Sequence, residues 1–171
     1  MLMSIEVLSG EVVGAAVLDK NLPELSEARR QRFTDLLVKS KVLAGSRIVI
    51  VIFESRAREG VVIPNFHEKD LLAAEAAEKS GGLIIYNPEP GESVCLWETP
   101  EQMKLGTNTN EHREAAKLAP LAYESWRVSQ WEVNVLTDGG EVDAVPVSLM
   151  GYDGTVRYHT LYENGLPVLA A

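Results

Sequence analysis

Apolar residues predict a buried central strand at residues 48–53. All six residues from Ile48 to Phe53 are apolar, and most of them are β-branched. A strand with one face in water alternates apolar and polar residues, whereas a strand buried on both faces does not. We therefore expect this strand at the centre of a sheet, with helices or a second layer on each face. The run is too short to cross a bilayer, which needs about 20 residues.

The spacing of apolar residues predicts a helix on either side of this strand. The first spans residues 25–43 and ends before Gly45, a residue type that commonly terminates helices. The second begins after Asn65, which we expect to cap it while Glu68 reaches back to the cap. It ends at the glycine pair 81–82, where a positive φ is easily adopted.

Two more helices are expected between residues 99 and 126. Thr99 followed by Pro100 is typical of a helix start, so a short helix should open there. Another should start near Glu111. Because proline lacks a backbone donor and clashes with the preceding turn, Pro120 should kink or break that helix. Residues 121–126 would then continue it at a new angle.

Short apolar runs separated by turn residues predict three hairpins in the first half of the chain. Residues 5–18 contain two such runs. Residues 61–63 form a short run that should pair with the strand at 48–53. Residues 83–88 and 93–97 flank a Pro-Glu-Pro-Gly turn, which indicates the third hairpin.

The last third of the chain predicts a β-meander. Residues 131–137 alternate between apolar and polar types, and residues 141–150 and 156–162 form two further runs. Asp-Gly and Asn-Gly pairs follow or separate these runs, and such pairs are typical of tight hairpin turns. Pro146 cannot donate a ladder hydrogen bond, so its strand should be an edge strand or carry a bulge.

Together these elements predict a single α+β domain over residues 1–171. Its sheet should be mixed or mostly antiparallel, with helices packed on it. Residues 1–98 would form the helix and strand half, and residues 99–171 the kinked helix with the meander.

Charge is distributed unevenly along the chain. The net charge is −9, and residues 86–171 hold 13 acidic and 5 basic side chains, whereas residues 1–85 hold 12 and 11. An acidic half disfavours nucleic acid, since phosphate binding requires Lys and Arg. It suits a basic partner protein, a divalent metal, or solubility alone. Neither a signal peptide nor a membrane segment is indicated, so we expect a cytoplasmic protein; its oligomeric state stays open.

Motifs for cofactors and nucleophiles are absent. The chain has no G-x-G-x-x-G, no P-loop and no G-x-S-x-G, so we expect no cofactor. The histidines His67, His112 and His159 lack the spacing of metal ligands on one helix. Cys95 lies in an apolar run, where cysteine usually acts as a small hydrophobic residue. It would form a nucleophile and base pair only if the fold brought a histidine to it.

The first helix is basic. Its arginines could contact phosphate, or they could meet an acidic neighbour, including the acidic half of the same chain. Interleaved Glu27 and Asp35 favour a solvated helix face instead. The candidate basic face consists of Arg29, Arg30 and Arg32.

Aromatic and acidic residues concentrate in the meander. Trp and Tyr are common anchors of protein interfaces, although the same residues could also form the core. We therefore predict a non-enzymatic, acidic protein-binding module: an inhibitor, an immunity-type protein, an adaptor or a complex subunit. The candidate partner-binding residues are Trp131, Glu141, Asp143, Tyr158 and Tyr162.

The segment Gly140-Glu141-Val142-Asp143 resembles the strand of PD-(D/E)XK nucleases that carries a metal-binding aspartate. The resemblance implies a divalent-metal nuclease in which Glu111 or Glu114 is the upstream helical acid, with Asp143 and Glu141 on the strand. In that family the next strand supplies a further ligand and a lysine. Residues 156–160, Val-Arg-Tyr-His-Thr, lack both. Outward charges at Glu141 and Asp143 also suit a strand that must avoid edge pairing.

Overall fold

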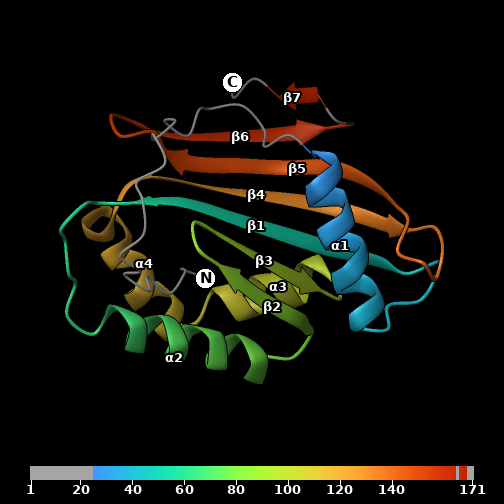
Figure 1. Cartoon of the computed structure of the whole chain (residues 1–171), viewed down its shortest axis with the longest axis horizontal. Coiled ribbons are helices and arrows are strands. Elements are labelled where there is room, and N and C mark those ends of the chain that lie inside the picture. The colour runs from blue at the N-terminus through green and yellow to red at the C-terminus, as the bar shows by residue number, and fades with distance from the viewer. Residues whose placement is uncertain (1–24, 165, 169–171) are drawn as a thin grey trace.

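The computed structural model describes residues 25–164 and 166–168. The expected hairpin at 5–18 lies outside these residues. Four helices and a seven-stranded sheet make up the described part (Figure 1). In chain order the elements are α1 (Glu27–Lys39), β1 (Arg47–Ala57), α2 (Phe66–Lys79), β2 (Leu83–Glu89), β3 (Glu92–Trp97), α3 (Pro100–Thr107), α4 (Asn110–Ala122), β4 (Tyr123–Val135), β5 (Val142–Tyr152), β6 (Arg157–Glu163) and β7 (Leu166–Val168).

The sheet confirms the expected α+β class. Its strand order is β2-β3-β1-β4-β5-β6-β7, and every neighbouring pair is antiparallel. The meander β4–β5–β6–β7 and the β2–β3 hairpin both form as the turn residues predict. Among the described residues, no helix is both long enough and apolar enough to span a membrane.

The central strand is β1, and both of its faces are buried as predicted. Ile50 and Ile52 have no exposed surface, and Val49 on the opposite face is 1% exposed. The expected hairpin with residues 61–63 is wrong, since these residues form no strand. β1 pairs instead with β3 and β4, which offer longer ladders on both of its edges.

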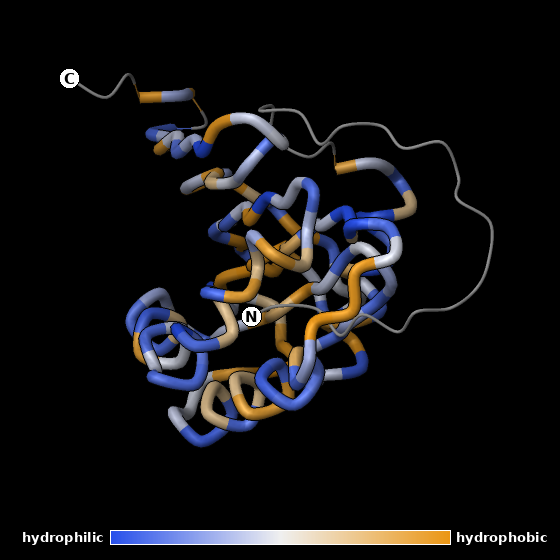
Figure 2. The backbone as a smooth tube through the Cα atoms, turned by 90° about the vertical axis from the view of Figure 1, so that its left-hand side faces the viewer, coloured by the Kyte–Doolittle hydropathy of each residue, from blue (hydrophilic) through white to orange (hydrophobic). Residues whose placement is uncertain are grey.

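Alternate residues of β1 contact different helices. Ile48, Ile50 and Ile52 join a core cluster with Phe33 and Leu37 of α1. We call this the α1 face of the sheet; α1 crosses in front of the strands in Figure 1. Hydrophobic segments gather in the interior, where helices meet the sheet (Figure 2).

The opposite face carries the other three helices, and we call it the cavity face. Small residues let α2 and α4 pack closely, among them Ala73 and Ala115, which join Phe53 in one cluster. A second cluster joins Val49 to Met103 of α3. Alanine side chains are small. The space between a helix and the sheet is therefore filled only where a larger side chain projects into it.

Two helix expectations are wrong in detail. Asn65 precedes α2 with φ +60°, and its side chain makes no capping hydrogen bond. Pro120 lies in the last turn of α4, and the helix ends at Ala122 rather than continuing to residue 126. Residues 123–126 alternate between buried and partly exposed positions and begin β4. The alternating pattern, which suits a sheet, therefore outweighs continuation of the helix.

Pro146 produces the expected bulge. Gln130 pairs with Ser148 while Trp131 pairs with Pro146, so β5 contains one extra residue at this point. β6 pairs with β5 only over residues 148–152. The start of β5 is therefore paired on one side only within the described chain.

Candidate functional site

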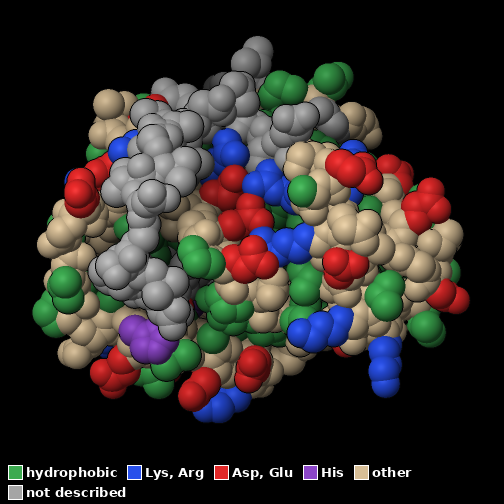
Figure 3. Space-filling view, in the orientation of Figure 1, with side chains coloured by type: hydrophobic (Ala, Val, Ile, Leu, Met, Phe, Trp, Pro, Cys, Tyr) green, Lys and Arg blue, Asp and Glu red, His purple; other side chains and the backbone are tan. Residues whose placement is uncertain are grey.

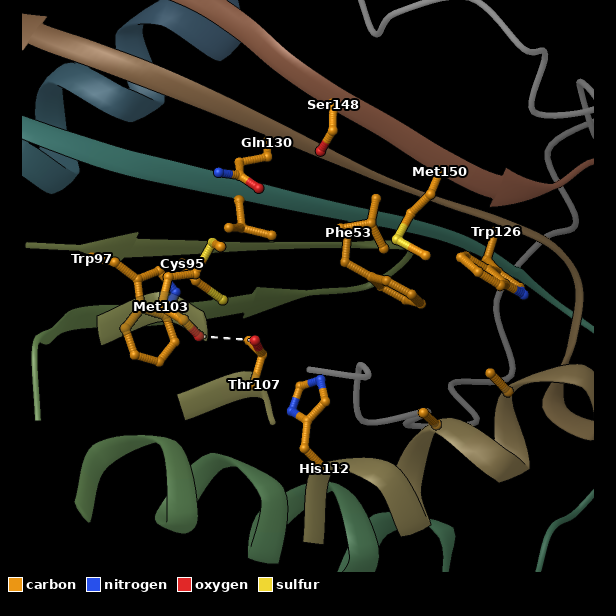
Figure 4. A pocket seen from close by; sticks show the side chains of 14 residues that line it. Phe53, Cys95, Trp97, Met103, Thr107, His112, Trp126, Gln130, Ser148 and Met150 are labelled. Carbon is orange, nitrogen blue, oxygen red and sulfur yellow. Dashed lines mark hydrogen bonds between the residues drawn. The ribbon is translucent and has the colours of Figure 1, made fainter. Parts of the chain in front are cut away.

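A cavity of about 290 Å³ lies between the sheet and helices α3 and α4 (Figure 4). Four strands form one wall of it, and the two helices form the other. An apolar cavity of about 150 Å³ is enough to hold benzene, so this space suits a molecule of one or two rings.

One row of side chains crosses the sheet wall from β3 to β5. Cys95 pairs with Val51, Val51 with Gln130, and Gln130 with Ser148. All four line the cavity. Because register partners lie about 5 Å apart, the amide of Gln130 and the hydroxyl of Ser148 are neighbours. Figure 4 shows both side chains directed into the cavity.

A second row supplies large apolar side chains. Phe53 pairs with Val128 and Val128 with Met150. The rings of Phe53 and Trp126 are stacked, with centroids 6.5 Å apart. Trp97 lies away from them, toward the other end of the cavity (Figure 4). The cavity therefore has aromatic surface at both ends.

The helix wall is held by local hydrogen bonds. The hydroxyl of Thr107 donates to the carbonyl of Met103 at 2.8 Å, inside α3. Thr109 caps α4 by accepting from the backbone N–H of His112 at 3.2 Å. That cap fixes the first turn of α4, from which His112 projects toward the cavity (Figure 4).

The close approach of α3 to the sheet depends on Gly106. A Cβ at this position would lie 2.2 Å from the Trp97 ring. The absence of a side chain lets the helix rest directly on the tryptophan, which is 1% exposed. The position of Trp97 in the cavity wall is thereby fixed.

None of the described residues that line the cavity is Asp, Glu, Lys or Arg. Burial lowers the pKa of His112 to about 3, so the imidazole is neutral at pH 7. Burial also raises the pKa of Cys95 to about 12, so the thiol is protonated. A protonated thiol is a poor nucleophile, and Cys95 and His112 therefore do not form an activated pair.

Two lining residues mark the mouth of the cavity. Met150 on β5 is 43% exposed, and Ala116 on α4 is exposed as well. Both residues line the cavity and reach solvent, so the cavity is open at this part of its wall.

Two polar side chains of the sheet wall have no hydrogen-bond partner in the part of the chain that the structure describes. Among the described residues, no side chain or backbone group hydrogen-bonds to the amide of Gln130 or to the hydroxyl of Ser148. They stand in a wall that is otherwise apolar over Val51, Phe53 and Val128.

A buried polar pair lies behind the cavity. Asp70 of α2 is 1% exposed and hydrogen-bonds to Tyr86 of β2, the register partner of Cys95. Burial and the Asp70 carboxylate raise the pKa of Tyr86, so the phenol remains protonated. Nothing in the sequence pattern marks Asp70, because it is one of four acidic residues in α2 and looks like a solvated position.

The predicted basic face is largely an internal ion network. Arg29 binds Glu54 at 2.9 Å and Glu92 at 2.5 Å, and Arg127 of β4 binds Glu54 at 2.5 Å. Arg32 binds Glu92 as well. The side chains of these five residues are between 10% and 20% exposed. Basic and acidic groups meet near the centre of this face in Figure 3.

In this network the arginines of the first helix meet acidic neighbours of their own chain, which was one of the possibilities considered for them. Arg32 also contacts Glu89 at 3.3 Å, so two of the acidic partners, Glu89 and Glu92, come from the acidic half. Arg30 is exposed and donates to the carbonyl of Leu25 at 3.1 Å. Only Arg30 of the three predicted arginines remains mainly at the surface.

The five predicted partner-binding residues separate into two groups. Trp131 is 6% exposed in the core under α1, where its Nε1–H donates to the hydroxyl of Ser129 at 3.1 Å. The others reach the surface of the meander: Glu141 and Asp143 are exposed, and Tyr158 and Tyr162 are partly exposed.

The acids of the nuclease-like hypothesis are not brought together. Within the described residues, no three His, Cys, Asp or Glu side chains are grouped so that they could hold a metal ion. Glu114 is exposed on α4 and pairs with Lys117, which lowers the pKa of its carboxyl. Asp143 is an exposed residue at the start of β5, where it pairs with Asn134.

A family model described as PB2B2.08-like matches residues 33–146, two thirds of the 171-residue chain. The chain belongs to this family. The match includes the cavity walls from Val51 to Gln130 and ends before Ser148 and Met150. The family description names no activity. No curated protein matches the chain.

Proposed function

We propose that this member of the PB2B2.08-like family binds a small organic molecule in the cavity. The observation that carries the proposal is the wall itself: apolar and aromatic surface with a few polar groups and an opening to solvent. Small-molecule sites in proteins have this composition, and their volumes begin at about 300 Å³. A neutral imidazole and a protonated thiol favour binding over nucleophilic catalysis here.

Toluene is a suitable first probe, because it matches the apolar wall and requires no hydrogen bond. Two of the three tryptophans, Trp97 and Trp126, line the cavity, whereas Trp131 lies on the α1 face. We expect toluene to change tryptophan fluorescence saturably and to raise the melting temperature, since a ligand that binds only the folded state stabilises it.

A variant at the mouth tests where the probe binds. Ala116→Phe should fill the entrance and abolish both effects of toluene. Lys117→Phe is the matched control, because Lys117 is exposed on the next position of α4 and does not line the cavity. Equal binding by both variants would contradict the proposal.

Protein binding through the meander is a second candidate function. It is supported by the half-paired start of β5 and by large apolar residues that are exposed on β5 to β7. Leu161 is 52% exposed and Leu166 is 71% exposed. Acidic Glu141 and Asp143 lie near the open edge, so the partner would carry basic groups.

Affinity capture from the native cell tests this candidate when two variants are compared. Leu161→Asp should lose a partner that wild type retains. Leu105→Asp should keep it, because Leu105 is 65% exposed on α3, away from the meander. A partner that both variants retain would not bind at this surface.

A further inference from the structure

We infer that the cavity selects an uncharged ring compound whose single hydrogen-bonding group is directed at Gln130 and Ser148. The inference rests on the proposed binding function and adds the chemical class of the ligand. Three observations support it: the absence of Asp, Glu, Lys and Arg from the described lining, the aromatic ends of the cavity, and two polar side chains between them that have no hydrogen-bond partner among the described residues.

The absence of charged side chains disfavours ionic ligands. An ion that enters the cavity leaves bulk water, and no lysine, arginine, aspartate or glutamate of the described lining pairs with it. Burying an unpaired charge costs far more than burying a neutral polar group. His112 stays neutral at pH 7 and supplies no compensating positive charge. Carboxylates, phosphates and ammonium compounds should therefore be rejected.

The aromatic ends favour a ring. Trp97 lies at one end, and the stacked pair Phe53 and Trp126 at the other, with Val51 and Val128 on the sheet between them. Aromatic rings gain attraction from offset or edge contacts with one another, in addition to the area they bury. A flat molecule lying along the sheet would contact both ends.

Gln130 and Ser148 set the position of the polar group. As register partners on β4 and β5, they place an amide and a hydroxyl side by side in an apolar wall. An amide and a hydroxyl can each donate and accept, so an alcohol, phenol or carbonyl group can bind to either. A ligand without such a group would displace water from these atoms and leave them unpaired.

Four probes of nearly equal size separate these requirements: toluene, benzyl alcohol, benzoate and benzylammonium. Their dissociation constants are measured at pH 7 by tryptophan fluorescence and checked by calorimetry. We expect toluene and benzyl alcohol to bind. Benzoate and benzylammonium should each bind at least about 100-fold more weakly than benzyl alcohol.

Two variants test the role of the polar pair. Gln130→Met and Ser148→Ala keep the approximate shape of the wall and remove its hydrogen-bonding groups. Each should weaken the binding of benzyl alcohol by about threefold to tenfold. The affinity for toluene should stay unchanged or increase. A change in the ratio of the two affinities cannot result from a general loss of folding, because that loss would affect both probes equally.

The outcomes are distinguishable. If no probe binds wild type, the proposed binding function itself fails. If toluene binds but benzoate or benzylammonium has the same affinity as benzyl alcohol, the binding function stands. The inference that the ligand is uncharged is then overturned. If both variants leave the benzyl alcohol to toluene ratio unchanged, Gln130 and Ser148 do not direct the ligand, and that part of the inference is overturned.

Discussion

The two faces of β1 are packed in different ways. On the α1 face, Ile50 and Ile52 are fully buried under Phe33 and Leu37, and an ion network continues the contact beyond the apolar core. On the cavity face, α3 and α4 leave about 290 Å³ unfilled over the same strand. One face thus holds a buried ion network, and the other holds a cavity whose described lining has no Asp, Glu, Lys or Arg.

The difference follows from the side chains that each helix brings to the sheet. α1 brings Phe33 and Leu37 into the core and two arginines to its border, where Glu54 ends the apolar part of β1. α4 brings alanines at Ala116 and Ala119, which cannot fill the space over the sheet. Close packing stabilises, whereas unfilled apolar space is retained at a cost in stability. We read the cavity face as the functional one for this reason.

The largest expected effect comes from breaking the ion network. Glu54→Gln should destabilise the protein by about 3 kcal/mol, because it removes the carboxylate that Arg29 and Arg127 share, while Arg29 keeps its pair with Glu92. Urea unfolding measures the change.

The matched control is Glu132→Gln on the neighbouring strand. Its pair with Arg47 has side chains that are 35% and 71% exposed, so its loss should cost less than about 1 kcal/mol. Equal effects of the two substitutions would show that the network stabilises no more than a surface pair.

The next largest effect on stability comes from adding one methylene group to a valine on either face of the sheet, in two separate variants. Val94 on the α1 face has no exposed surface, and Val94→Ile should cost about 1–3 kcal/mol through overpacking. Val51 lines the cavity, and Val51→Ile should be neutral or stabilising while it weakens toluene binding. Thermal and urea unfolding check both. A large loss in Val51→Ile would mean that the cavity face is as tightly packed as the other.

Acid should destabilise the cavity face through His112. Its pKa of about 3 lies below the ordinary value of 6.5, so protons bind preferentially to the unfolded chain between these values. Stability should therefore fall by up to about 1.4 kcal/mol for each pH unit below 6.5. Urea unfolding at pH 7 and pH 5 measures this. His112→Gln should reduce the loss, and His67→Gln, at an exposed position of α2, should not.

The last prediction concerns the reactivity of the thiol on the cavity wall, and it involves no change in stability. Cys95 is 3% exposed, and its pKa is about 12. We expect an aromatic disulfide reagent to react at least about 100-fold more slowly with the folded protein than with the chain in denaturant. Because the chain has one cysteine, absorbance reports this site alone. Rapid reaction in the folded state would mean that the cavity admits the reagent and stabilises a thiolate.

Patterns that are local in the sequence predicted most of the fold. The uninterrupted apolar run of β1, the turn residues of the meander and the cap at Thr99 each depend on neighbours within a few residues. The helix continuation after Pro120 and the strand at 61–63 were wrong, because both positions allow more than one local structure and long-range pairing decides between them.

The candidate site could not be predicted in the same way. Cys95, Val51, Gln130 and Ser148 lie far apart in the chain and become neighbours only through the register of four strands. Gln130 and Ser148 look like ordinary polar positions of an alternating strand. His112 was one of three histidines that the sequence did not distinguish, and its neutrality at pH 7 depends on burial.

The position of β1 at the centre of an α+β domain follows from its own residues, because an apolar run with no polar break must be covered on both faces. How each face is covered depends on the tertiary structure. The arginines of α1 became an internal network because strand pairing places Glu54 and Glu92 together under the helix. The cavity lies where α3 and α4 cross the sheet and α4 presents the small side chains of Ala116 and Ala119, which depends on helix placement and on no local pattern.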